Sequence, residues 1–183
     1  MKITFFTLIY KIKSKFNFQK YYDWGVNLIQ TLKNHELIIF TDKNTYTEIE
    51  ELVEDKNNIT IIYKNLDDFE LNQYKEVFEK NTSKRYFPYH DISYKLIMIW
   101  INRHLFFNEV SKLKDSDFYC HLDWGYFRQN PISNFCSEEV LLNLNKNKIY
   151  FALIRNDIVY LKKIINLIED FNKEKIEKTL EDN

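Results

Sequence analysis

The residues with the clearest chemical potential are His121-Leu122-Asp123-Trp124-Gly125, which follow a short apolar run. The run 117–122 has the composition of a buried β-strand, and aspartate is uncommon in strands and rarely buried without a partner. Asp123 is therefore expected either to cap the turn after the strand or to bind a ligand there. We favour a ligand, because α/β proteins bind ligands outside the carboxyl ends of their strands.

His121 and Asp123 are two positions apart, so on a strand their side chains point to the same face. Imidazole nitrogen and carboxylate oxygen both bind Mn²⁺-like ions, and waters and substrate phosphates can complete such a site. The pair predicts half of a divalent-cation site, the alternative being that His121 is a core histidine. A metal-assisted phosphoester hydrolase is a weaker hypothesis, because the further carboxylates of a two-metal site are not found at a recognisable spacing.

Polar residues also stand near the ends of two earlier predicted strands. Thr7 and Tyr10 end the first strand, and Asp42 ends the second. Because the carboxyl ends of parallel strands share one edge, these side chains could converge with Asp123 on one ligand. Asp42 suits a ribose or a base edge, or else it caps the turn that it begins.

Three further residues flank the motif and could contact the same ligand. Lys95 lies on a helix before the motif strand and Arg128 follows the motif, so either could neutralise a diphosphate or be a solvated surface charge. Trp124 could stack on a sugar ring or fill the wall of a cleft. The sequence therefore predicts six substrate-binding residues: Thr7, Tyr10, Asp42, Lys95, Trp124 and Arg128.

The predicted elements indicate an α/β fold. The first third of the chain predicts strand, helix, strand, helix and strand, in that order, at 3–10, 21–32, 37–40, 46–53 and 59–63. This order is typical of a mostly parallel sheet flanked by helices. Further along we expect a helix at 69–80, a helix at 92–107 with Asp91 as N-cap, the motif strand, a helix at 138–144, a strand at 148–154 and a helix at 158–182.

Length and composition fit one domain over residues 1–183. The formal net charge of −1 gives no sequence-wide attraction to nucleic acid or anionic lipid, so neither is an expected partner. No apolar run is long enough to cross a bilayer, and the apolar start lacks a cleavage site, so we expect no transmembrane segment and a cytoplasmic location. Cys120 and Cys136 lack the spacing of a zinc site or a disulfide framework.

The chain has only two glycines, Gly25 and Gly125. The glycine-rich loops of dinucleotide-binding proteins and P-loop proteins are therefore excluded, as is the nucleophile elbow of α/β hydrolases. Both glycines end Asp-Trp-Gly tripeptides. Because the flanking residues differ and the first tripeptide falls within a predicted helix, we interpret the similarity as a coincidence.

Two segments together resemble the HtrL/YibB-like proteins, which are similar to nucleotide-sugar-dependent glycosyltransferases of the GT-A fold. They are residues 89–98, Tyr-His-Asp-Ile-Ser-Tyr-Lys-Leu-Ile-Met, and residues 118–128, Phe-Tyr-Cys-His-Leu-Asp-Trp-Gly-Tyr-Phe-Arg. The resemblance covers roughly residues 1–155. It implies a Rossmann-like sheet whose Asp-x-Asp motif falls on His121-Leu122-Asp123, so that histidine replaces the first carboxylate. The short chain after the motif implies a minimal version, or one truncated after about residue 155.

The resemblance also implies an activity. The expected protein is a glycosyltransferase of the hexosyltransferase type, which transfers a sugar from a nucleotide diphosphate sugar to a hydroxyl of a glycan acceptor, in glycan or polysaccharide biosynthesis. Asp123 and His121 would bind Mn²⁺ or Mg²⁺, and the candidates for a catalytic base are His90, Asp91 and His121. The alternative is a non-catalytic relative of the same fold that binds a nucleotide sugar or acts in assembly.

Overall fold

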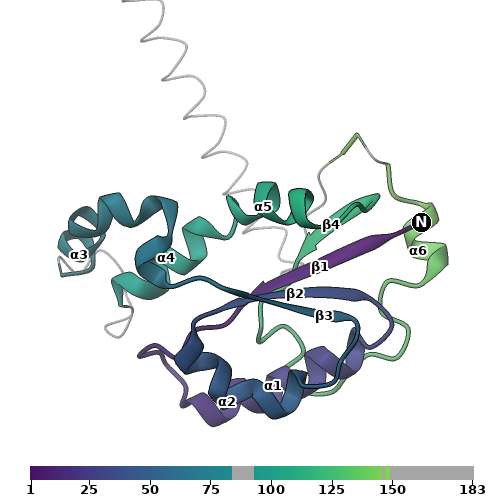
Figure 1. Cartoon of the computed structure of the whole chain (residues 1–183), viewed down its shortest axis with the longest axis horizontal. Coiled ribbons are helices and arrows are strands. Elements are labelled where there is room, and N and C mark those ends of the chain that lie inside the picture. The colour runs from purple at the N-terminus through teal and green to yellow at the C-terminus, as the bar shows by residue number, and fades with distance from the viewer. Residues whose placement is uncertain (84–92, 146, 149–183) are drawn as a thin grey trace, which may run out of the picture. The chain divides into compact units, whose positions relative to one another are not determined.

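The computed structural model describes residues 1–83, 93–145 and 147–148 (Figure 1). The chain divides into two compact units, 1–146 and 147–183, and the fold described below is that of the first unit. The predictions for His90 and Asp91, for most of the strand at 148–154 and for the helix at 158–182 fall outside the described residues. A single domain over the whole chain therefore stays a prediction.

Four strands form one parallel sheet in the order β3-β2-β1-β4. Their bounds are β1 (Ile3–Leu8), β2 (Glu36–Thr41), β3 (Ile59–Tyr63) and β4 (Phe118–His121). Phe6 of β1 lies opposite Ile38 of β2 and His121 of β4. The α/β class predicted from the sequence is confirmed, and every pair of neighbouring strands in the described residues is parallel.

Helices cover both faces of this sheet (Figure 1). One face carries α1 (Phe18–Thr31), which connects β1 to β2, and α2 (Lys43–Val53), which connects β2 to β3. Between β3 and β4 the chain forms 3-10 turns at Leu66–Asp68 and Glu70–Tyr74, followed by α3 (Lys75–Ser83), α4 (Tyr94–Asn102) and α5 (Phe106–Leu113). A short α6 (Glu138–Leu142) follows β4. Within the described ranges, no helix is both long and apolar enough to cross a membrane.

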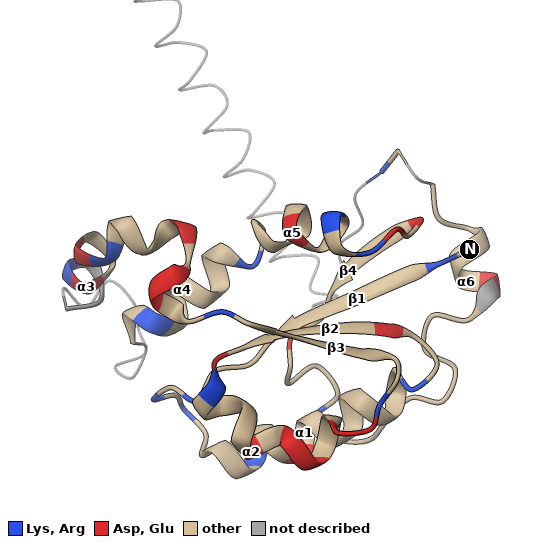
Figure 2. Ribbon diagram, viewed as in Figure 1, with Lys and Arg blue, Asp and Glu red and all other residues tan. Residues whose placement is uncertain are grey.

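The alternation of side chains along β1 divides the core into two clusters. Phe5 packs with Leu28 of α1 on one face, and Phe6 packs with Met98 and Phe106 of α4 and α5 on the other. Because both faces are covered, every residue of β1 is buried, and all but Thr4 and Thr7 are apolar, as is usual for strands of parallel sheets. Figure 2 shows the result: the charged residues lie mainly on helices and loops, and the strands are nearly uncharged.

The helix predicted over 92–107 is two helices in the structure. α4 begins after Ser93, whose hydroxyl accepts a hydrogen bond from the Leu96 amide at 3.3 Å. It ends at Asn102, whose side chain is buried, donates to the Met98 carbonyl and accepts from the Leu71 amide. These side-chain bonds to backbone groups compete with helix continuation. The prediction of one continuous helix was therefore wrong, and the cap is Ser93.

The two Asp-Trp-Gly tripeptides, whose similarity the sequence suggested to be a coincidence, lie against each other. An added Cβ on Gly25 would stand 2.3 Å from Cζ2 of Trp124, and one on Gly125 would stand 2.7 Å from Cε3 of Trp24. Each glycine thus accommodates the tryptophan of the other tripeptide. The indole nitrogen of Trp124 also donates to the Tyr21 carbonyl at 2.7 Å. We call this arrangement the reciprocal Trp–Gly contact.

Gly25 is needed for space and not for backbone freedom, because its φ is not positive. It lies inside α1, where glycine is less favourable than alanine by about 1 kcal/mol. The helix tolerates this cost because only a residue without a side chain lets the Trp124 ring approach the α1 backbone. The contact joins the segment after β4 to α1, about 100 residues earlier in the chain.

Gly25→Ala should destabilise the protein by up to about 2 kcal/mol, because overpacking against Trp124, at about 1–3 kcal/mol, exceeds the gain of about 1 kcal/mol in helix propensity. The measurement is the free energy of unfolding from urea titration. The control is the same change in a Trp124→Leu background, where the clashing ring atoms are absent and Gly25→Ala should be neutral or stabilising. A stabilising effect in the otherwise unchanged protein would contradict the reciprocal Trp–Gly contact.

Candidate functional site

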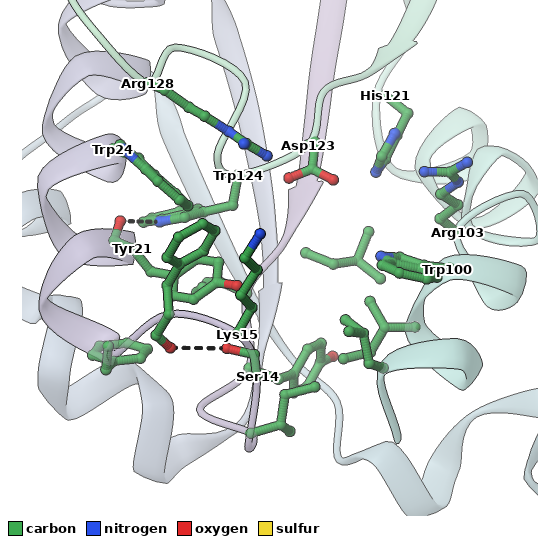
Figure 3. A pocket seen from close by; sticks show the side chains of 18 residues that line it. Ser14, Lys15, Tyr21, Trp24, Trp100, Arg103, His121, Asp123, Trp124 and Arg128 are labelled. Carbon is green, nitrogen blue, oxygen red and sulfur yellow. Dashed lines mark hydrogen bonds between the residues drawn. The ribbon is translucent and has the colours of Figure 1, made fainter. Parts of the chain in front are cut away.

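A cavity of about 640 Å³ lies at the carboxyl ends of β1 and β4. These two strands are neighbours, but α1, which connects β1 to β2, lies on one face of the sheet, whereas α4 and α5, which precede β4, lie on the other. Such a change of direction leaves a crevice beyond the strand ends, and α/β proteins bind their ligands there. Figure 3 shows α1 as one wall of this crevice and α4 as the other.

All three tryptophans of the chain line this cavity. Trp24 and Trp124 form one wall and are held in place by the reciprocal Trp–Gly contact. Trp100 stands on the opposite wall, on α4, with 40% of its surface exposed. Flat aromatic surfaces on two walls suit a ligand that contains planar rings or the apolar face of a sugar.

Asp123 both caps a turn and faces the cavity. Its Oδ1 accepts a hydrogen bond from the Gly125 amide at 3.1 Å, and its carbonyl accepts from the Tyr126 amide at 2.9 Å. The carboxylate points into the cavity (Figure 3), and its Oδ2 has no hydrogen bond to any residue that the structure describes. The two roles considered from the sequence are therefore compatible, because each oxygen can serve one of them.

His121 is the last residue of β4 and lies on the same rim of the cavity. Its ring is edge-on to Phe6, with 5.2 Å between the ring centroids. The pKa of His121 is lowered to about 4, mainly by burial and also by the charges of Arg103 and His104, whereas Asp123 opposes the shift. The imidazole is therefore neutral at pH 7, the form in which histidine accepts a hydrogen bond or binds a metal ion.

Three cationic side chains line the cavity from three different segments. Lys15 belongs to the loop between β1 and α1, Arg103 follows α4, and Arg128 follows the motif. The guanidinium carbon of Arg128 lies over the Trp24 ring, 4.9 Å from the ring centroid, and its Nε donates to the Gly125 carbonyl at 3.1 Å. None of the three forms an ion pair with a described residue, and the pairs that the described ranges contain, Lys11–Glu48, Lys64–Glu109 and Lys114–Glu36, lie elsewhere.

Five of the residues predicted from the sequence meet at this cavity: Tyr10, His121, Asp123, Trp124 and Arg128. Tyr10 contributes its ring alone, because its hydroxyl is buried and donates to the Lys64 carbonyl at 2.9 Å. Burial, and then the nearby Asp42, raise the pKa of this hydroxyl far above its usual range. Tyr10 therefore acts as a wall of the site and not as an acid or base.

Three other predicted residues that the structure describes lie outside the cavity lining. Thr7 is fully buried in β1, and its hydroxyl has no hydrogen-bond partner among the described residues. Asp42 caps α2 by accepting the Thr45 amide at 2.7 Å, which is the alternative that the sequence left open. Lys95 is exposed on α4. The structure does not bring these side chains to the group around Asp123.

Arg103 lines the cavity where Lys95 was expected, and the helical repeat explains the difference. Leu96, Ile99, Trp100 and Arg103 follow at the spacing that keeps residues on one face of a helix, and all four line the cavity. Lys95 is one position away from this row and points elsewhere. In the sequence these residues form the apolar face of a predicted helix. The arginine at the end of that face indicated that a cationic group would lie at the site.

The donors for a metal ion are fewer than in a complete protein site. Among the described residues, no three histidine, cysteine, aspartate or glutamate side chains converge. Asp123 and His121 remain as two potential ligands on one rim, so that a bound cation would need waters or ligand oxygens for the rest of its shell.

No protein-family model, no curated protein and no solved structure matches the chain. The resemblance to HtrL/YibB-like proteins therefore stays a prediction from the sequence. What the cavity binds has to be inferred from its shape, its rings and its charges.

The shifted pKa of His121 predicts a pH dependence of stability. The folded state takes up the imidazole proton only near pH 4, whereas the unfolded chain takes it up near pH 6.5. The unfolded state thus binds more protons between these values, so that stability is complete above pH 6.5 and falls as the pH drops toward 4, by about 1–3 kcal/mol.

NMR titration of the His121 ring checks this, with the signal assigned by its absence in His121→Asn. Arg103→Met should raise the pKa of His121 only in part, because burial is the larger cause. The matched control, Lys95→Met, should leave it unchanged. A His121 titration near 6.5 in the unmodified protein would show that the ring is solvated and that the described environment is incorrect.

Proposed function

We propose that the protein binds a nucleotide diphosphate sugar in this cavity and transfers the sugar to a hydroxyl acceptor. The observation that carries the proposal is a combination found at the carboxyl edge of a parallel sheet: tryptophan walls, one carboxylate, and three cationic groups that form no ion pair with a described residue. The cavity volume of about 640 Å³ falls within the range of about 300–1,000 Å³ that is usual for small-molecule sites.

Each part of such a ligand has a matching surface. The aromatic rings of Trp24, Trp100 and Trp124 suit the base and the apolar face of the sugar. The guanidinium groups of Arg103 and Arg128 suit the diphosphate, since their planar forks match phosphate oxygens. The Oδ2 of Asp123, which has no hydrogen bond to a described residue, is available to a sugar hydroxyl or to a metal ion.

The transfer needs charge stabilisation more than it needs an unusual nucleophile. The bond between the sugar's anomeric carbon and the diphosphate oxygen breaks, and its electron pair leaves with the nucleoside diphosphate. A bond forms to the acceptor oxygen, and the hydroxyl proton is released. Arg103 and Arg128 would stabilise the charge that develops on the leaving diphosphate.

The proton acceptor in this reaction has one described candidate. His121 is neutral at pH 7 and faces the cavity, but a pKa of about 4 makes it a weak base for a reaction near neutral pH. His90 and Asp91, the other candidates from the sequence, lie outside the described residues.

A GT-A-like fold is part of the proposal. It is supported by the site at the ends of β1 and β4 and by the resemblance of residues 89–98 and 118–128 to the HtrL/YibB-like proteins. If Mn²⁺ or Mg²⁺ binds, Asp123 and His121 would be its protein ligands, and the cation would supply a further positive charge on the leaving diphosphate.

A second candidate is a non-catalytic protein that binds nucleotide sugars. One observation favours it: in the described part of the chain, Asp123 is the only carboxylate that lines the cavity. Such a protein would bind the ligand without releasing nucleoside diphosphate when glycan acceptors are added, whereas an enzyme would release it.

Calorimetry with a panel of UDP- and GDP-sugars tests the binding step. Trp100→Ala should weaken binding by about tenfold, because a stacking surface and its buried area are lost. Ile101→Ala is the matched control, since Ile101 is the next residue of α4, is similarly exposed (42% against 40%) and does not line the cavity. Failure of every nucleotide sugar to bind, or equal effects of the two substitutions, would overturn the proposal.

A further inference from the structure

The uncompensated charge of the cavity is its most unusual feature. Lys15, Arg103 and Arg128 contribute three positive charges to the lining, whereas Asp123 contributes one negative charge. Clusters of like charge at the mouth of a protein cleft attract oppositely charged ligands. The structure thus leaves room for an anion that carries two or more negative charges.

The position of Arg128 is fixed by its neighbours and leaves part of its guanidinium free. Its Nε donates to the Gly125 carbonyl, and its guanidinium carbon lies over the Trp24 ring. The two terminal nitrogens make no hydrogen bond to the described residues, and the side chain reaches into the cavity beside Asp123 (Figure 3). A guanidinium held in this way can donate two parallel hydrogen bonds to phosphate oxygens.

Arg103 reaches the opposite end of the same rim, next to His121 (Figure 3). Both side chains line the cavity. A cation beside His121 repels a divalent metal ion there by Coulomb repulsion. Because the described residues offer no third donor, a metal site at His121 and Asp123 would be both incomplete and repelled.

We propose that Arg103, Arg128 and Lys15 hold the diphosphate of the ligand directly, so that binding does not require a divalent cation. The inference rests on the proposed function for the identity of the ligand, but not for the presence of an anion site. In this arrangement Arg103 and Arg128 contact the diphosphate from two sides, Lys15 closes the site from the β1–α1 loop, and Asp123 accepts a hydrogen bond from a sugar hydroxyl.

The experiment measures the binding of UDP, GDP, their sugars and inorganic pyrophosphate by calorimetry, in EDTA and in Mn²⁺. Affinity in EDTA should stay within about threefold of that in Mn²⁺. Arg103→Met, Arg128→Met and Lys15→Met should each weaken binding about tenfold or more, which is the usual effect of losing a charged hydrogen bond. Lys95→Met, on the exposed side of α4, should have no effect.

Asp123→Asn gives a test of opposite sign. The amide oxygen can still accept the Gly125 N–H, so the turn is retained while the negative charge is removed. If cationic side chains hold the diphosphate, pyrophosphate should bind as tightly or more tightly in EDTA. If a metal ion on Asp123 holds it, binding in Mn²⁺ should weaken.

The outcomes separate this inference from the proposed function. Nucleotide sugars that bind only with Mn²⁺ would overturn the inference and leave the proposed function intact. If pyrophosphate bound in EDTA through the three cations but no nucleotide bound, the proposed function would be overturned and the anion site would be retained. Arg128→Lys and Arg103→Lys, which keep the charge, should bind the ligand better than the methionine variants at the same positions. If the lysine and methionine variants lost affinity equally and also had a lowered melting temperature, the loss would be an effect on folding and would count against direct contact.

Discussion

Two tryptophans packed against two glycines hold the segment after β4 onto α1, and most of the cavity is built on that packing. Trp24 and Trp124 would each collide with a side chain at the opposite glycine. The same contact aligns three other groups: Asp123 precedes Trp124, Arg128 stacks on Trp24, and the Gly125 backbone binds both Asp123 and Arg128. The only glycines of the chain are therefore used for close approach between elements and not for a phosphate-binding loop.

The topology of the sheet explains why this packing borders a cavity. β1 and β4 are adjacent and parallel, but α1, which follows β1, covers one face of the sheet, whereas α4 and α5, which precede β4, cover the other. Beyond the strand ends the two layers diverge, so α1 and α4 face each other across a space that the sheet does not fill. The rings of Trp24 and Trp100 line the two sides of this space, and the charged groups lie on its rim (Figure 3). Shape and charge at the site thus arise from elements that are distant in the sequence.

The sequence predicted the parallel sheet and the motif at its edge, because both depend on local patterns: apolar runs for strands and an acidic residue directly after one of them. It did not predict the partners of the motif. Asp42 has a strand-end position like that of Asp123, but it lies at the end of β2 and caps the next helix, whereas Asp123 lies where the crevice opens. Lys95 and Arg103 belong to different faces of the same helical segment, and only Arg103 lines the cavity. Which face borders the cavity cannot be predicted until the position of the cavity is known. The contact between the tripeptides is a tertiary contact, and no local pattern encodes it.

The histidine at position 121 acquires a physical meaning from its neighbour Arg103. A carboxylate at this position, as in the Asp-x-Asp motif that the sequence resembles, would form an ion pair with Arg103 and cancel its charge. The neutral imidazole places no negative charge beside Arg103, which forms no ion pair with a described residue, and is itself kept neutral by burial and by that arginine. A histidine at this position, where the motif has an acid, therefore leaves the rim one unit more positive. The neutral histidine and the arginine beside it, which forms no ion pair with a described residue, together leave the rim with the positive charge on which the proposed anion site depends.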